Sequence, residues 1–212
     1  MTGALILREI RRGLSGPAWL PVAFFLLVAT IVPFAVGPDA RLLARIGGGA
    51  LWIAALTAAL LPIDRLVEPD RADGVLDQLA LTATAEEAVG AAKMIGHWLT
   101  FGPLLLIAAV PGSFLVGLDG PALTRSLVAL AVGTPALAAL AVAVAALTAG
   151  LPRAGSLAGL LLMPLAVPLL IFGAAATGDG EISAKKLEAA VALLSVAGAP
   201  FVTGAAIRAS RT

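Results

Sequence analysis

The side chains that could carry out acid–base or nucleophilic chemistry are few in this sequence. It contains one histidine, His97, and no cysteine, which excludes a disulfide framework, a thiolate metal site and a cysteine nucleophile. His97 could ligate a haem iron or carry a proton, but a histidine near the end of a membrane helix more often satisfies a neighbouring group. Its neighbours Gly96 and Trp98 offer no second ligand, so a metal site is disfavoured. His97 stays a candidate functional residue without an assigned role.

An intramembrane serine–histidine hydrolase is one function that these residues leave open. Ser113 follows His97 by sixteen residues on the same predicted helix, which separates them by about 24 Å and rules out a hydrogen-bonded dyad. Ser156 is on the same predicted side of the membrane as His97, so distance does not exclude it. Its surroundings show no recognisable oxyanion arrangement, and we keep this class of enzyme only as an alternative.

Nucleotide hydrolysis requires a phosphate-binding loop, and the sequence has none. The three lysines, Lys93, Lys185 and Lys186, all lie outside a G-x-x-x-x-G-K-[ST] pattern. The predicted membrane spans carry no ionisable residue between their ends, which argues against transport coupled to ions. We therefore expect a non-catalytic chain that binds no cofactor of its own, and any energy that it uses should come through a partner.

The composition predicts an all-α integral membrane protein. The chain has 212 residues, of which 60% are hydrophobic and 13% charged, and its mean hydropathy is +1.02. No basic patch with interleaved aromatic residues is present, so nucleic-acid binding is excluded. We expect a single transmembrane domain over residues 1–212 with six spans of about twenty residues each, at about 18–36, 46–62, 95–116, 126–149, 157–177 and 189–207.

The N-terminal residues 1–17 are amphipathic at helical spacing. Arg8, Arg11, Arg12 and Ser15 share one face. This pattern predicts an interfacial helix in the lipid headgroup layer. The alternative is a secretion signal, with the arginines before the apolar run 19–36, but no cleavage site follows that run.

The longest polar interruption is the stretch 63–93, which holds ten of the chain's 14 basic and 13 acidic residues. Its residues 69–74 have turn chemistry, and Asp73 is placed to cap a short helix. Thr84 and Glu87 have the spacing of a capping box, so a second helix should begin near Ala85. We interpret the stretch as a docking element that couples the chain to a partner, rather than a solvated loop. The candidate coupling residues are Asp73, Gly74, Val75, Leu76, Asp77, Leu79, Glu86 and Glu87.

The distribution of basic residues predicts the orientation in the membrane. Six spans put both termini on one side, and that side carries nine lysines and arginines against five on the other. Both termini and the stretch 63–93 should therefore be cytoplasmic. The loop 178–188, with Lys185, Lys186 and Glu188, should face outward.

Several segments together resemble the haem exporter protein B family (CcmB) over essentially the whole chain. They are RLLARI at 41–46, LWIAAL at 51–56, DGVLDQL at 73–79, KMIGHW at 93–98, GTP at 133–135, MPLAVPLLIF at 163–172, PF at 200–201 and AAIR at 205–208. The resemblance implies a permease of the type-2 ABC transporter kind, working as a homodimer in the bacterial inner membrane.

The resemblance also implies partners and a role. The stretch 63–93 would sit on a separate ATP-binding cassette subunit, beside a haem-handling membrane subunit and a small single-span subunit. ATP hydrolysis would drive haem export, or the release of a haem-loaded periplasmic chaperone. The family's tryptophan-rich haem segment belongs to another subunit, and Trp19, Trp52 and Trp98 are scattered here. The alternative is a non-transporting membrane scaffold of the same complex.

Overall fold

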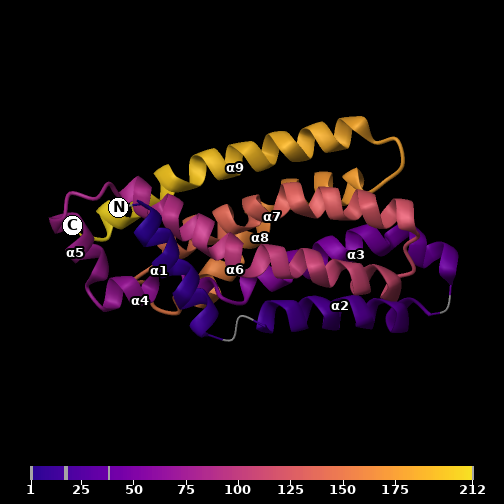
Figure 1. Ribbon diagram of the computed structural model, residues 1–212, viewed down its shortest axis with the longest axis horizontal. Helices are drawn as coiled ribbons and strands as arrows, with labels where there is room; N and C mark the ends of the chain where they lie inside the picture. The colour runs from indigo at the N-terminus through magenta and orange to yellow at the C-terminus, as the bar shows by residue number, and fades with distance from the viewer. Residues whose placement is uncertain (1, 17–18, 38, 212) are drawn as a thin grey trace.

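The computed structural model describes residues 2–16, 19–37 and 39–211 of the chain. Within these residues the protein is all-helical, and its long helices run along one axis (Figure 1). The elements are α1 (Thr2–Ser15), α2 (Leu20–Val36), α3 (Ala40–Leu60), the 3₁₀ turn η1 (Ile63–Arg65), α4 (Glu68–Ala72), α5 (Val75–Leu81), α6 (Glu86–Leu115), α7 (Gly120–Thr148), α8 (Ala154–Ala176) and α9 (Ile182–Ala209).

Each of the six predicted spans overlaps one long helix of the structure, with different bounds. In the part of the chain that the structure describes, the helices α3, α6, α7, α8 and α9 provide five segments long and apolar enough to cross a membrane, and counting α1 and α2 together gives a sixth. By itself α2 has 17 residues, about 25 Å of helix, which is at the lower end of what a bilayer requires. The fold is thus that of a multi-pass membrane protein.

Several helices extend beyond the apolar windows that predicted them. Helix α6 begins at Glu86, close to the start predicted near Ala85, and so continues well before its apolar span, while α9 begins at Ile182 rather than near 189. The expectation of a loop over 178–188 is therefore wrong for residues 182–188. Lys185, Lys186 and Glu188 are helical, and Glu188 is only 2% exposed. Hydropathy marks the apolar part of a helix, whereas backbone hydrogen bonding continues through charged residues.

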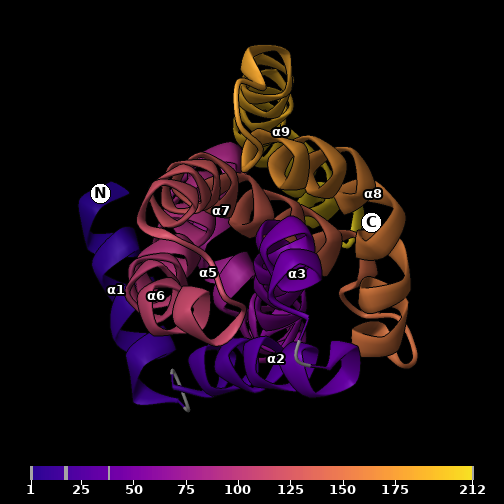
Figure 2. The ribbon, with the colours of Figure 1, turned by 90° about the vertical axis from the view of Figure 1, so that its right-hand side faces the viewer.

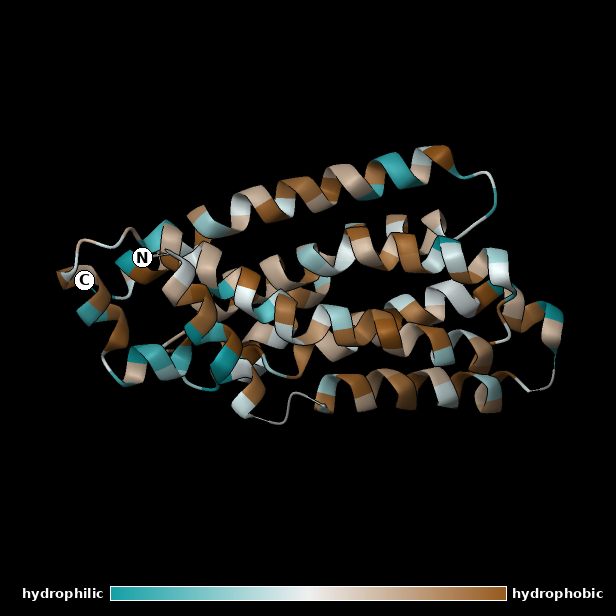
Figure 3. Cartoon of the chain, in the orientation of Figure 1, coloured by the Kyte–Doolittle hydropathy of each residue, from teal (hydrophilic) through white to brown (hydrophobic). Residues whose placement is uncertain are grey.

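The view along the axis shows α3 near the centre of the bundle (Figure 2), where it packs against α2, α6, α7 and α8. Helix α9 lies at the outer edge and packs against α6, α7 and α8, while α1 crosses the outside of α6. Both termini, α4 and α5 lie at the same end of the bundle (Figure 1). Hydrophilic residues gather at that end and in the turns at the other end, and the long helices between are mostly apolar (Figure 3).

Small residues allow the helices to approach closely. Ala139 and Ala143, one turn apart on α7, are both buried and form a cluster with Ala199 of α9. Small residues at this spacing let two helices pack closely in lipid. At the centre, the Trp52 indole of α3 is 1% exposed and lies against two glycines, Gly133 of α7 and Gly173 of α8. A Cβ on either glycine would collide with the indole ring.

The Trp52 contact gives a stability prediction. Gly133→Ala should lower the thermal unfolding midpoint of the purified protein in detergent, because overpacking a close-packed core costs about 1–3 kcal/mol. That cost exceeds the gain of about 1 kcal/mol that alanine brings to a helix interior.

The matched control is Gly159→Ala on α8, where an added Cβ would meet nothing within 4 Å. It should leave the midpoint unchanged or raise it slightly. A Gly133→Ala protein as stable as the parent would show that the indole does not need the space at Gly133.

Candidate functional site

The predicted coupling stretch forms a hairpin of two short helices, α4 and α5, at the end of the bundle that carries both termini (Figure 1). Gly74 connects them in the left-handed conformation, with φ of +70°, which glycine adopts without strain. The predicted helix after the turn is confirmed, but the predicted cap is wrong. Gly74 occupies the N-cap of α5 without a side-chain bond, and Asp73 instead ends α4, its backbone N–H donating to the Pro69 carbonyl.

The second predicted helix start is confirmed at α6, but its capping box does not form. The N-cap residue is Ala85, which has no side chain to cap with. The Thr84 hydroxyl lies 3.0 Å from the Thr82 hydroxyl instead. The carboxylates of Glu86 and Glu87 accept bonds from arginines of the C-terminal segment and from their own backbone N–H groups, so Glu87 does not pair with Thr84 as a capping box requires.

Two arginines at the C-terminal end hold the hairpin and α6 together. Arg208 Nη1 donates to Glu87 Oε1 at 2.6 Å and to Glu86 Oε2 at 3.3 Å. Arg211 donates from Nη1 to Glu86 Oε1 at 2.8 Å, and from Nη2 to the Leu76 carbonyl at 2.5 Å. Its Nε also lies 3.3 Å from Asp77 Oδ1. The structure therefore brings four of the predicted residues, from α5 and α6, around the end of α9.

Burial divides the predicted coupling residues into two groups. Leu76 is 3% exposed and packs in a cluster with Ile63 and Ile207, against which Leu79 also packs. The opposite side of the hairpin is exposed and includes Leu81, which is 88% exposed. The inward residues anchor the hairpin, and the exposed residues include Asp73, Gln78 and Leu81, together with Asp77, which is exposed but paired with Arg211.

A buried carboxylate, Asp70 of α4, gathers cations from two other helices. Arg8 binds it in a bidentate manner, Nη2 to Oδ1 at 2.6 Å and Nη1 to Oδ2 at 3.2 Å. Arg12 and Lys93 also bond to the same carboxylate, which is 1% exposed. With Glu9, which lies 3.4 Å from Lys93 Nζ, these residues form the Asp70 cluster: Arg8, Glu9, Arg12, Asp70 and Lys93.

The Asp70 cluster joins α1, α4 and α6. Lys93 Nζ donates a further bond of 2.9 Å to the Leu66 carbonyl, so this buried ammonium has several oxygen partners. A buried ion pair is tolerated only when its charges are satisfied in this way. Sequence reasoning missed the cluster because Asp70 was assigned to a turn. The spacing of Arg8 and Arg12, four apart on one helical face, was the available signal, but it does not identify the partner.

The predicted amphipathic helix at the N-terminus is present as α1, and it packs across α6 (Figure 2). Two glycines allow close contact: a Cβ on Gly13 would lie 2.6 Å from Thr100 Cγ2, and a Cβ on Gly96 would collide with Glu9. Arg8 and Arg12 face Asp70, whereas Arg11 is exposed. Two arginines of the basic face of α1 therefore bind a carboxylate of the same chain, and the third is exposed at the surface.

His97 lies on the same face of α6 as Lys93, and both line a cavity of about 250 Å³ beside α1. The histidine is 6% exposed and its ring centroid is 4.8 Å from that of Phe101. Among the described residues its Nε2 has no hydrogen-bond partner. In the same part of the chain, no group of three or more histidine, aspartate or glutamate side chains is arranged to hold a metal ion.

The sequence is similar to proteins of one family over nearly its whole length. The family model described as "CcmB protein" matches residues 1–210. "Heme exporter protein B" of Paracoccus denitrificans (strain Pd 1222) is 44% identical, over 97% of this chain and 97% of that protein, and the Rhodobacter capsulatus protein of the same name matches equally well. The protein of that name in Escherichia coli (strain K12) is 39% identical, over 93% of this chain and 90% of its own length.

The Asp70 cluster predicts that Asp70→Asn will loosen α1 from α6. Removing one partner of a buried ion pair costs about 3–5 kcal/mol because the opposite charges stay buried. The chain has no cysteine, so a single Thr100→Cys beneath Gly13 can report on the contact. A maleimide should label the thiol introduced by Thr100→Cys more than tenfold faster in the protein that also carries Asp70→Asn than in the protein that does not.

The control is Asp73→Asn, which removes the same charge from an exposed position on the same hairpin. It should leave the labelling rate unchanged. If Thr100→Cys alone and its combinations with Asp70→Asn and with Asp73→Asn are all labelled at the same rate, α1 is held by its apolar contacts alone.

Proposed function

Because this chain belongs to the CcmB family, we propose that it is the membrane permease subunit of an ABC transporter complex, coupled to a separate ATP-binding subunit through α4 and α5. It is a multi-pass membrane subunit of the haem export system used in cytochrome c maturation. ATP binding and hydrolysis on the partner would move the helices of this chain, and that movement would drive haem export or the release of a haem-loaded chaperone.

The observation that carries the proposal is the way the hairpin is built. It presents an exposed face that includes Asp73 and Leu81, while it is attached to the bundle by the packing of Leu76 and by the Arg211 bonds to the Leu76 carbonyl and Asp77. A docking element must be exposed to its partner and firmly attached to what it moves. The hairpin meets both conditions.

The attachments reach most of the bundle. Through the Asp70 cluster α4 is linked to α1 and α6, and through Arg211 α5 is linked to α6 and α9. Glu68 of α4 also accepts a 2.7 Å bond from the Gly150 backbone N–H, between α7 and α8. A displacement of the hairpin would therefore act on α1, α6, α9 and the α7–α8 turn together.

The wider assembly follows from the family. We propose that the chain works as a homodimer in the bacterial inner membrane, with both termini and the hairpin in the cytoplasm. Its further partners would be a haem-handling membrane subunit, a small single-span subunit and the periplasmic haem chaperone. The cargo would be haem, with ATP held only by the ATP-binding subunit.

The test is Leu81→Glu in the complete complex. If the exposed face of α5 docks on the ATP-binding subunit, a buried charge at a central contact should cost about 2 kcal/mol or more of binding free energy. The ATP-binding subunit should copurify at least tenfold less well, and the yield of mature cytochrome c should fall. Because Leu81 is exposed in the isolated chain, the thermal stability of the variant should match that of the parent.

The matched control is Ile182→Glu, an exposed aliphatic residue at the start of α9 on the opposite end of the bundle. It makes the same chemical change where the ATP-binding subunit should not reach. Full copurification and full cytochrome yield with Leu81→Glu would contradict docking through α5.

A further inference from the structure

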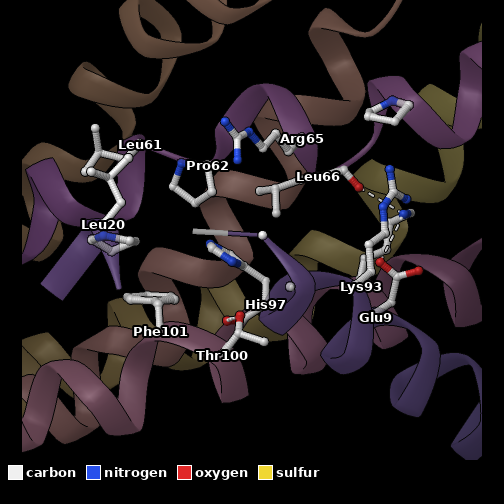
Figure 4. Close-up of a pocket in the computed structure, with 15 residues that line it drawn as sticks. Glu9, Leu20, Leu61, Pro62, Arg65, Leu66, Lys93, His97, Thr100 and Phe101 are labelled. Carbon is white, nitrogen blue, oxygen red and sulfur yellow. Dashed lines mark hydrogen bonds and ion pairs between the residues drawn. The ribbon is translucent and has the colours of Figure 1, made fainter. Parts of the chain in front are cut away.

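A cavity of about 250 Å³ lies between α1, the start of α2, the end of α3 and α6 (Figure 4). Its walls differ in chemistry from one side to the other. Figure 4 shows the apolar side chains of Leu20, Leu61 and Phe101 on one side, and Lys93 with Glu9 on the other. An occupant that fits this cavity has a polar part and an apolar part.

His97 lies between the two sides of the cavity (Figure 4). Its side chain is more than nine-tenths buried, yet among the described residues its Nε2 bonds to no other group. Leaving a buried polar atom unpaired is costly, and nearly all such atoms in proteins have a partner. A ligand with a hydrogen-bonding group at this position would satisfy the imidazole.

Arg65 of η1 supplies a positive charge to the same cavity. The other basic side chains of the lining, Arg12 and Lys93, are already bonded to Asp70. The Arg65 guanidinium is exposed and takes part in none of the ion pairs found among the described residues. Its charge is therefore available for an anion, and a phosphate group is well matched to the planar guanidinium.

The change in polarity follows the direction in which α6 enters the membrane. Lys93, His97 and Phe101 are four residues apart and share one face, so the cavity passes from charged to apolar over about 12 Å of helix. A phospholipid has the same order along its length, with its phosphate at the interface and its chains deeper. A free phosphate ion would use only the charged side of the cavity.

We propose that this cavity binds an anionic phospholipid from the membrane leaflet in which α1 lies. The lipid phosphate contacts Arg65 and His97, and the first part of an acyl chain lies along Leu20, Leu61 and Phe101. The bound lipid fills the cavity bounded by α1, the start of α2, the end of α3 and α6, next to the Asp70 cluster. This site is independent of the docking role of α5 and does not require it.

The experiment uses the full chain in nanodiscs of phosphatidylcholine with a minor fraction of phosphatidylglycerol, released into native mass spectrometry. The parent should retain one phosphatidylglycerol in preference to phosphatidylcholine. Arg65→Gln should weaken this binding about tenfold, the effect of losing one hydrogen bond to a charged group. His97→Phe, which keeps an aromatic ring beside Phe101, should also weaken it.

The control is Arg11→Gln, which removes the same charge from an exposed position on α1 outside the cavity. It should bind phosphatidylglycerol like the parent. Equal losses in the two arginine variants would mean a diffuse charge effect and would overturn the site, as would a parent with no preference for phosphatidylglycerol.

Two further measurements separate other occupants from a lipid. If inorganic phosphate displaces phosphatidylglycerol, and removal of the acyl chains does not weaken binding, the site takes a free anion and the proposal fails. If haem displaces the lipid with a visible spectral change that His97→Phe abolishes, the cavity is a haem site and the proposal also fails. Unchanged thermal unfolding of Arg65→Gln would confirm that its effect is local.

Discussion

The structure depends most on one buried carboxylate, that of Asp70. Three cations from α1 and α6 converge on it. Asp70 and Lys93 are buried, so leaving either of these two charges without its partner is costly, whereas the partly exposed Arg8 and Arg12 can still be solvated. The carboxylate therefore determines where α1 lies on α6 and how α4 is placed under both. Without this contact, α1 would be held on α6 only by close contacts such as that of Gly13 with Thr100, and α4 would keep only the bond that Glu68 accepts from the Gly150 N–H.

The attachments of the hairpin on its α4 side and on its α5 side differ in chemistry. On the α4 side the attachment is a buried ionic contact, and on the α5 side it is a set of more exposed bonds from Arg211 together with the packing of Leu76. Exposed ion pairs are weak and screened by salt, whereas buried ones are not. The ionic part of the α5 attachment should therefore weaken more with added salt than the contact of α4 with α1 and α6, while the packing of Leu76 is unaffected by salt.

Much of the fold could be predicted because its signal is local. Long apolar runs such as the one in α7 predict membrane-spanning helices, and the polar break after Leu81 predicts the start of α6. The missed features depend on residues distant in the sequence. No residue near Asp70 in the sequence identifies Arg8 as its partner. In the sequence Glu87 has the spacing of a capping box, and only the structure shows that its carboxylate binds Arg208. The two faces of α5 could likewise be separated only once the packing of Leu76 was known.

The indole of Trp52 has a consequence for motion. It belongs to α3 and lies against backbone glycines of both α7 and α8, where no side chain can bend aside. Sliding of any of these three helices along another would drive the ring into a main chain, and close-packed interiors resist such shear. Helices α3, α7 and α8 therefore form a rigid block. The ring thus acts as a spacer that keeps these three helices in one register along the bundle.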